Sequence, residues 1–427
     1  MTEPSVTQQE RARALLADPA LARVLAAVDA GGAQTRVVGG AVRNALMARP
    51  VNDIDCATTA LPQQVVERAR AAGLKAVPTG IEHGTVTIVC DGRPFEITTL
   101  RRDVATDGRH AEVAFGTDFA EDARRRDFTI NALYLDREGR VYDFTCGLAD
   151  IAARRVRFIG DAGARIREDF LRIMRFFRFS ADYGEGPLDV IGLSACVRER
   201  YGLSRLSRER VRAELLRLLV ARRALDVVGA MADTGILGLI TAGVGEHGRL
   251  ARAVTHGSDA LVRLAALAVS LPEDAERLRE RLRLSNGEHA RLSAAGALIA
   301  HLHGRTLPID AQALRRLVVE HGLQPVADAL VVVEGEPTPA LTDDARAQRD
   351  AYVAGRETPP VFPLTGKHVA KAGVAPGPRM GQVLARARDL WLDTDMPADS
   401  ARLAALLDEA IKAFSSKADI GLREENA

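Results

Sequence analysis

Two aspartates separated by one apolar residue carry the clearest chemical information in the chain. They are Asp53 and Asp55 in the stretch VNDIDCAT. In a β-strand, residues i and i+2 project from the same face, so both carboxylates would point together while Ile54 packs behind them. Paired carboxylates repel each other unless a cation lies between them, and oxygen ligands suit hard divalent cations. The pair therefore predicts a metal site that is catalytic.

A pair of glycines precedes these aspartates in the stretch GGAVRNAL. Gly39 and Gly40 would allow the backbone to approach a ligand closely. The following helix would direct free amides and its positive dipole end at a phosphate, with Arg43 one turn further on. A phosphate-binding turn followed by two metal-binding aspartates is the arrangement that two-metal nucleotidyl transfer requires.

A third carboxylate commonly completes such a site, and two residues compete for that role. Glu96 lies in the short strand-like run FEITTL, and Asp127 lies in RRRDFTINALYLD. We favour Glu96 because its run alternates apolar and polar residues. In the second block, Arg125, Asp127 and Asn131 combine cations, a carboxylate and an amide that could hold the phosphates and ribose of a nucleotide. A helix cap with a salt bridge would have the same composition.

The stretch EDFLR offers a pair of side chains that could read a base. On a helix, Asp169 and Arg172 would stand side by side at positions i and i+3. Cytosine and adenine each present an amino donor beside a ring-nitrogen acceptor, whereas uracil and guanine present carbonyl acceptors beside a ring N–H. Aspartate as acceptor and arginine as donor would therefore admit C and A and reject U and G. The alternative is a surface salt pair.

These residues need a small α/β region to position them. We expect an amphipathic helix over residues 10–31, followed between residues 35 and 143 by one helical stretch, PQQVVERARAAG, among short strands. The expected strands are TRVVGG, NDIDCAT, GTVTIVC, FEITTL, ALYLD and RVYDF. Residues 104–122 lack periodicity and carry glycines, which predicts a mobile loop. From about residue 162 onward the pattern is almost wholly helical, so the fold class is α+β.

The composition of the chain argues against a membrane protein and against a disulfide- or metal-binding role for its cysteines. No apolar run approaches the roughly 20 residues of a membrane span, and the N-terminus is polar, so we expect a cytoplasmic protein without membrane contact. The four cysteines lack metal-ligand spacing and are interpreted as buried thiols. Between Arg165 and Arg217 the chain has twelve arginines, no lysine and eight carboxylates. This excess suits bidentate recognition of phosphates or bases, and equally a solvated helix surface.

The order of these motifs resembles the class II tRNA nucleotidyltransferase and poly(A) polymerase family. The family pattern GGxVRDxLLGRxxxDxD is matched by GGAVRNALMARPVNDID, and the next blocks are matched by RRDFTINAL, by EDFLR followed by RIMRFFRF, and by SRERVRAELLRLL. The resemblance is tight over residues 35–220 and looser in the tail. It implies a catalytic head over 1–150, a neck over 151–220, a helical body over 221–335 and an RNA-binding tail over 336–427.

The resemblance also implies roles for individual residues. Asp53 and Asp55 would bind Mg²⁺, and Asp169 and Arg172 would form an amino-acid template for C and A. The residues expected to contact the nucleotide are Gly39, Gly40, Arg43, Arg125, Asp127, Asn131, Asp169, Arg172, Arg175 and Arg178. Glu209, Arg210 and Arg212 would support the base pocket or touch the primer. Asn44 departs from the family's aspartate, which weakens any role of that charge in orienting Arg43.

Within the family, the segment TGIEHGTVTI resembles the CCA-adding branch, and the basic stretch typical of the polymerase branch is missing. The loop DVATDGRHAEV resembles the element associated with full CCA addition rather than CC addition. The expected activity is addition of CCA to the tRNA 3′ end from CTP and ATP. A poly(A) polymerase and a non-catalytic RNA-binding module remain the alternatives.

Overall fold

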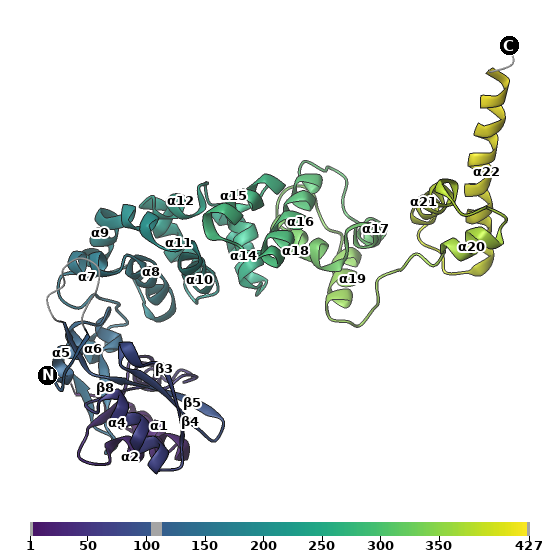
Figure 1. The fold of residues 1–427 in the computed structure, drawn as a ribbon. Coiled ribbons are helices and arrows are strands. Elements are labelled where there is room, and N and C mark those ends of the chain that lie inside the picture. Colours follow the sequence, from purple (N-terminus) through teal and green to yellow (C-terminus); the bar gives the residue numbers. More distant parts are fainter. Residues whose placement is uncertain (1–2, 104–112, 425–427) are drawn as a thin grey trace. The chain divides into compact units, whose positions relative to one another are not determined.

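The computed structural model describes residues 3–103 and 113–424, and the chain divides into two compact units, Met1–Ile240 and Thr241–Ala427. The labelled strands all belong to the first unit, and the second unit is built from helices (Figure 1). No helix of the described residues is long and apolar enough to cross a membrane. The α+β class expected from the sequence is confirmed.

A seven-stranded mixed sheet forms the centre of the first unit, in the order β3-β4-β5-β2-β1-β8-β9. Strands β2 and β5 run parallel, and the other neighbours run antiparallel. The strands are β1 (Thr35–Val38), β2 (Asp55–Thr58), β3 (Lys75–Gly80), β4 (Thr85–Cys90), β5 (Arg93–Thr99), β8 (Leu133–Leu135) and β9 (Val141–Asp143). The six expected strands are confirmed. Strand β3 was not expected because Pro78 and Gly80 disfavour strands, and it is tolerated here at the sheet edge.

The two faces of the sheet have different coverings. Paired residues of neighbouring strands share a face, so Val37, Cys56 and Ile97 form one row across β1, β2 and β5. All three are fully buried, and helices α2 (Pro19–Asp29) and α4 (Pro62–Ala71) pack against this side of the sheet. The adjacent row, Val38, Asp55 and Glu96, therefore faces the opposite side, where the two carboxylates are exposed.

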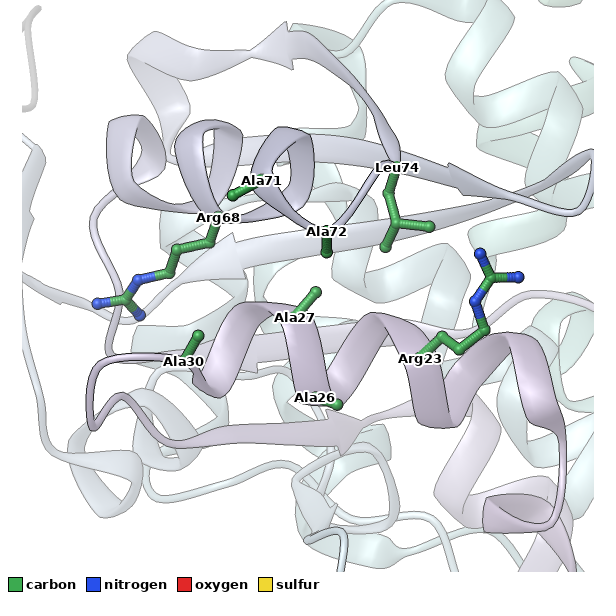
Figure 2. A pocket seen from close by; sticks show the side chains of 8 residues that line it. All are labelled: Arg23, Ala26, Ala27, Ala30, Arg68, Ala71, Ala72 and Leu74. Carbon is green, nitrogen blue, oxygen red and sulfur yellow. The ribbon is translucent and has the colours of Figure 1, made fainter.

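A hollow of about 500 Å³ lies between α2 and α4, away from that carboxylate row. Figure 2 shows Arg23 and Arg68 at its two ends, with small alanine side chains and Leu74 between them. Both arginines have partners, since Arg23 pairs with Asp91 at 3.0 Å and Arg68 donates to the Val28 carbonyl at 2.8 Å. The hollow reflects the small size of the alanines where the two helices pack.

Two expectations about the first unit were wrong. The segment 10–31 is two helices, α1 (Val6–Leu16) and α2, because Asp18 caps a new helix that has Pro19 at its first position. The described part of 104–122 is ordered: β7 (Val113–Phe115) pairs with β6 (Arg101–Asp103), and Asp118 caps α5 (Phe119–Arg124). Residues 104–112 of the expected loop lie outside the described residues.

Both units contain further helices beyond those described above. In the first unit they are α3 (Gly40–Leu46), α6 (Gly147–Ala152), α7 (Ala162–Glu168), α8 (Leu171–Tyr183), α9 (Val190–Glu199), α10 (Arg208–Leu219) and α11 (Ala224–Asp233), with the 3₁₀ helices η1 (Ile81–His83), η2 (Thr129–Asn131) and η3 (Arg200–Arg205). Helix α12 (Ile236–Thr241) ends where the second unit begins.

The second unit contains α13 (His247–Thr255), α14 (Ala260–Ala268), α15 (Pro272–Leu282), α16 (Asn286–Leu302), α17 (Ala311–His321), α18 (Leu323–Val333), α19 (Asp343–Val353), α20 (Gly366–Lys371), α21 (Pro378–Asp393) and α22 (Ser400–Glu424). Its last helices enclose an apolar cluster around Val369, Val383 and Trp391.

Candidate active site

The carboxylates expected to bind metal gather on the open face of the sheet. Asp55 and Glu96 are directly paired between β2 and β5, so their side chains project together. Asp53 precedes β2, so the expectation that both aspartates lie in one strand was wrong. Ile54 between them is only 5% exposed, as expected. The structure thus puts Glu96, rather than Asp127, beside the aspartate pair.

The electrostatics of this row suit a cation. Burial raises the pKa of Asp55, and the neighbouring charges of Glu96 and Asp53 raise it further, while Arg126 opposes them. Among the described residues no group of three or more His, Cys, Asp or Glu side chains is arranged to hold a metal ion by itself. Magnesium commonly takes one or two carboxylates and completes its shell with water and substrate phosphates. The donor set therefore fits a metal that binds together with a nucleotide.

The glycine turn leads from β1 into α3 beside these carboxylates. Gly39 has φ 73° and ψ −123°, a conformation that side-chain-bearing residues rarely adopt, and its amide donates to the Leu133 carbonyl at 3.2 Å. A Cβ at Gly39 would lie 3.5 Å from Nη1 of Arg126. The turn therefore passes close to a guanidinium that also acts electrostatically on Asp55.

Arg43 is nearly buried, at 6% exposure, and is held by side chains from three segments. Its Nε and Nη2 donate to Oδ1 of Asn44 at 3.1 and 2.9 Å, and its Nη2 also donates to the Tyr183 hydroxyl at 2.7 Å. The guanidinium lies 4.0 Å from the centre of the Tyr183 ring. Burial lowers the pKa of Arg43 to about 10, so the side chain keeps its charge at neutral pH.

A chain of buried polar contacts continues from Arg43 to α8. Its Nη1 donates to Oδ1 of Asn131, whose amide donates to Oδ1 of Asp127 at 3.1 Å. The other oxygen of Asp127 accepts from Nε and Nη2 of Arg175 at 2.8 and 2.6 Å. One turn further on, Arg178 pairs with Glu214 of α10 at 2.5 Å. Four of the expected nucleotide-binding residues thus also tie the sheet region to α8.

Asp122 pairs with two of the three arginines that follow it, Arg125 and Arg126, and the three side chains form the Asp122 clamp. Its Oδ1 accepts from Arg125 at 2.9 and 2.6 Å, and its Oδ2 accepts from Arg126 at 3.2 and 3.1 Å and from the Tyr134 hydroxyl at 2.8 Å. Burial alone would raise the pKa of Asp122, but the charges of Arg126 and Arg125 and the Tyr134 hydrogen bond lower it overall. Both guanidinium groups are therefore fixed in position, and the charge of Arg126 acts on Asp55.

The expected base-reading pair differs from its predicted geometry. Asp169 is not on a helix: it follows α7 with φ −150° and ψ 106°, and α8 begins at Leu171, so the assignment of a continuous helix was wrong. The two residues remain neighbours because the Arg172 amide donates to the Asp169 carbonyl at 3.0 Å. Asp169 accepts from Arg210 at 2.8 Å, whereas Arg172 pairs with Glu168 at 2.6 Å. Each side chain is thus held by a different partner.

Three contributing residues were missing from the sequence-based prediction: Asp122, Tyr134 and Tyr183. Arg126 belongs to the block RRDFTINAL, which the sequence had already indicated. The spacing of EDARRR could have indicated the Asp122 clamp, because arginines at i+3 and i+4 face an aspartate on a helix. Tyr134 and Tyr183 reach the site from other segments, and a single sequence does not reveal such contacts. Arg172 connects to the same group, since its Nη2 donates to the Arg125 carbonyl at 3.4 Å.

Comparisons with known proteins cover both the head region and the whole chain. Residues 35–157 match the family model described as the poly A polymerase head domain. The chain is 32% identical over 372 residues to the mitochondrial CCA tRNA nucleotidyltransferase 1 of Mus musculus, covering 84% of this chain and 82% of that protein. It is also 32% identical over 406 residues to the CCA-adding enzyme of Limosilactobacillus fermentum, covering 91% of this chain and 96% of that protein.

Solved structures show the same fold at lower identity. The Bacillus stearothermophilus CCA-adding enzyme in complex with CTP is similar with a TM-score of 0.69 and 24% identity, covering 93% of this chain and all of that one. The Thermotoga maritima CCA-adding enzyme complexed with tRNA is similar with a TM-score of 0.69 and 21% identity, covering 97% and 99%.

Proposed function

Since this chain belongs to the class II CCA-adding tRNA nucleotidyltransferase family, we propose that it adds C, C and A in turn to the tRNA 3′ end, using CTP and ATP without a nucleic-acid template. The observation that carries this proposal is the pairing of Asp55 with Glu96 beside the Gly39 turn, in a chain that matches CCA-adding enzymes over most of its length.

In each cycle the tRNA 3′-hydroxyl attacks the α-phosphate of the nucleotide and pyrophosphate leaves. The family depends on a metal, and we assign magnesium to Asp53 and Asp55; when bound there it would lower the pKa of the attacking hydroxyl and neutralise the leaving pyrophosphate. Glu96 would add a third carboxylate to this row. Nucleotidyl transfer requires the protein to position the reactants and stabilise charge, and it does not require a covalent intermediate with the protein.

Residues around the glycine turn would hold the nucleotide. The Gly39 and Gly40 backbone would approach the triphosphate, and Arg125 and Arg126 would supply positive charge from the Asp122 clamp. Arg43, Asn131, Asp127, Arg175 and Arg178 would act mainly by keeping this pocket in shape, because their polar atoms are engaged with one another or with Glu214.

Asp169 and Arg172 would read the base by exchanging their present partners. The Asp169 carboxylate would accept from the amino group of C or A in place of Arg210, and Arg172 would donate to the ring nitrogen in place of Glu168. We further propose that the chain divides into head, neck, body and tail near residues 150, 220 and 335. The helical part would bind tRNA by recognising the backbone and shape of the tRNA. The reaction would take place in the cytoplasm.

Product length tests the proposal. Purified protein and Mg²⁺ are incubated with tRNA that ends at the discriminator base, and with CTP, ATP, both, or UTP and GTP. Growth by two residues with CTP and by three with both nucleotides is expected. A long ladder with ATP alone would identify a poly(A) polymerase, which shares the head domain. No growth in any mixture would identify a non-catalytic RNA-binding module.

A further inference from the structure

The position of the Asp169 carboxylate depends on a break between two helices. Because Asp169 has extended backbone between α7 and α8, no helical repeat fixes its direction. Its Oδ1 accepts from the Leu171 amide at 3.1 Å, and its Oδ2 accepts from Arg210. The next residue, Phe170, packs its ring against η3, so its seat helps to hold the break in place.

Phe170 is seated on Gly202 of η3. A Cβ built on Gly202 would lie only 2.0 Å from Cδ1 and 2.1 Å from Cε1 of the Phe170 ring. Arg205, at the end of the same 3₁₀ helix, places its guanidinium 5.4 Å from the ring centre. Gly202 does not have a left-handed backbone, so the glycine is needed here for space and not for its conformation.

We infer that Gly202 is a positioning residue for nucleotide selectivity: the space it leaves seats Phe170, and this seat holds Asp169 at the distance from Arg172 that fits C and A. The inference rests on the proposed function, because it assumes that Asp169 and Arg172 read the base. It adds a residue 30 or more positions away in the chain, on the 3₁₀ helix η3.

The Asp169 carboxylate and the Arg172 guanidinium are held by different partners, so a change at position 202 should displace the first more than the second. Arg172 is held by Glu168 and by the Arg165 and Arg125 carbonyls. None of these contacts passes through Phe170 or η3. A side chain at position 202 must push the ring or η3 away by about 1 Å, since real Cβ contacts shorter than 3.0 Å are essentially not found. The Asp169 carboxylate would shift with Phe170, whereas the Arg172 guanidinium would stay held by these three contacts.

The test is Gly202→Ala, with Gly229→Ala as the matched control. Gly229 is in α11 of the same unit, and nothing lies within 4 Å of a Cβ there. Steady-state kinetics on tRNA would give kcat and KM for CTP, ATP and UTP in each variant. We expect Gly202→Ala to lower the CTP over UTP ratio of kcat/KM about tenfold, mainly by raising KM for CTP and ATP, because the Asp53 and Asp55 site is untouched. Gly229→Ala should keep the wild-type ratio.

The variant Phe170→Ala tests whether the effect of a side chain at position 202 acts through the Phe170 ring. Without the ring the steric conflict disappears, so the double variant should be no less selective than Phe170→Ala alone. Additive losses in the double variant, or an unchanged ratio in folded Gly202→Ala, would overturn the inference. If Gly202→Ala does not fold, Phe170→Ala tests the inference instead. It should also lower the CTP over UTP ratio of kcat/KM, and a wild-type ratio would contradict the role given to the packing of Phe170 on Gly202.

Two reference proteins keep this inference separate from the proposed function. Wild-type protein that adds no CCA would contradict the function itself. Asp169→Ala protein that still rejects UTP would contradict the base-reading pair. If wild type adds CCA and Asp169→Ala loses selectivity, an unchanged Gly202→Ala refutes the role of Gly202 alone.

Discussion

Asn44 shows how one substitution can keep geometry while it removes charge. The related family has aspartate at this position, and the loss of that charge was expected to weaken the orientation of Arg43. In the structure the Asn44 amide oxygen accepts two hydrogen bonds from Arg43, and its nitrogen donates to the Pro50 carbonyl at 2.9 Å. The orienting contact is therefore retained by an uncharged side chain.

Removal of this amide should impair nucleotide binding. Hydrogen bonds to a charged group contribute about 1.5–3 kcal/mol, so Asn44→Ala should raise KM for both CTP and ATP about tenfold. Asn44→Asp keeps the acceptor and should stay within about twofold of wild type. Steady-state kinetics with each nucleotide measures this, and an Asn44→Ala protein with unchanged KM would show that Arg43 needs no support from residue 44.

The carboxylate row makes a prediction about pH. Burial and the charges of Glu96 and Asp53 raise the folded-state pKa of Asp55 above 3.8, so its proton persists to a higher pH than on an ordinary aspartate. A protonated carboxyl does not hold Mg²⁺, and affinity should therefore fall as pH falls through this raised pKa. Glu96→Gln removes a like charge and should lower the pKa.

NMR titration of the labelled Asp55 carboxyl in metal-free protein measures the shift. Glu67→Gln is the control, because Glu67 is exposed on α4, which covers the other face of the sheet. An Asp55 pKa that does not respond to Glu96→Gln, or responds equally to Glu67→Gln, would contradict the pairing seen between β2 and β5.

Helix α8 is joined to the sheet region through Asp127. Burial alone would raise the pKa of this carboxyl, but the Arg175 charge and the hydrogen bonds from Asn131, Arg175 and the Phe128 amide lower it overall. A carboxyl with a lowered folded-state pKa stabilises the fold fully above its unfolded value, near 3.8, and this stabilisation is lost as pH falls toward the folded-state pKa.

Asp127→Asn should consequently destabilise the attachment of α8 by about 2 kcal/mol at neutral pH, because the partly buried Arg175 guanidinium would lose its ionised hydrogen-bond partner. Native-state hydrogen exchange of α8 amides reports this local free energy. The difference between wild type and variant should shrink below about pH 4. Asp226→Asn removes the exposed partner of Arg223 and should cost less than about 1 kcal/mol. Equal effects of the two substitutions would contradict the role given to Asp127.

A helix or strand could be predicted from the sequence where a short local pattern of apolar and polar residues determines it. The alternation in NDIDCAT and FEITTL predicted both β2 and β5, but their parallel pairing, which puts Glu96 beside Asp55, depends on the topology of the whole sheet. The break at Asp169 could not be predicted because the helical periodicity of RIMRFFRF extends back through EDFLR. The chain from Arg43 to Arg175 joins three distant segments, and no local pattern encodes it.

At the scale of the molecule, every candidate site residue lies in the first compact unit, Met1–Ile240. The second unit supplies helices α13–α22 but none of the candidate side chains. A fragment that ends after α12 should therefore bind CTP and ATP within about threefold of the full chain, and should bind tRNA at least about tenfold more weakly because phosphate contacts are lost.

Calorimetry with nucleotides and filter binding with tRNA at one salt concentration test this division. Circular dichroism serves as the folding control for the fragment. Full tRNA affinity in the fragment would assign tRNA recognition to the first unit, contrary to the role proposed for the body and tail.

The most direct measurement of the central claim is a competition experiment. The protein is incubated with Mg²⁺, tRNA ending at the discriminator base and all four nucleotides at equal concentration, and the new 3′ ends are sequenced. We predict that almost every extended tRNA ends in C, C and A and stops there, and that Asp53→Ala/Asp55→Ala protein, although folded, extends none. Runs of A, ends of mixed sequence, or extension by the double variant would contradict the account.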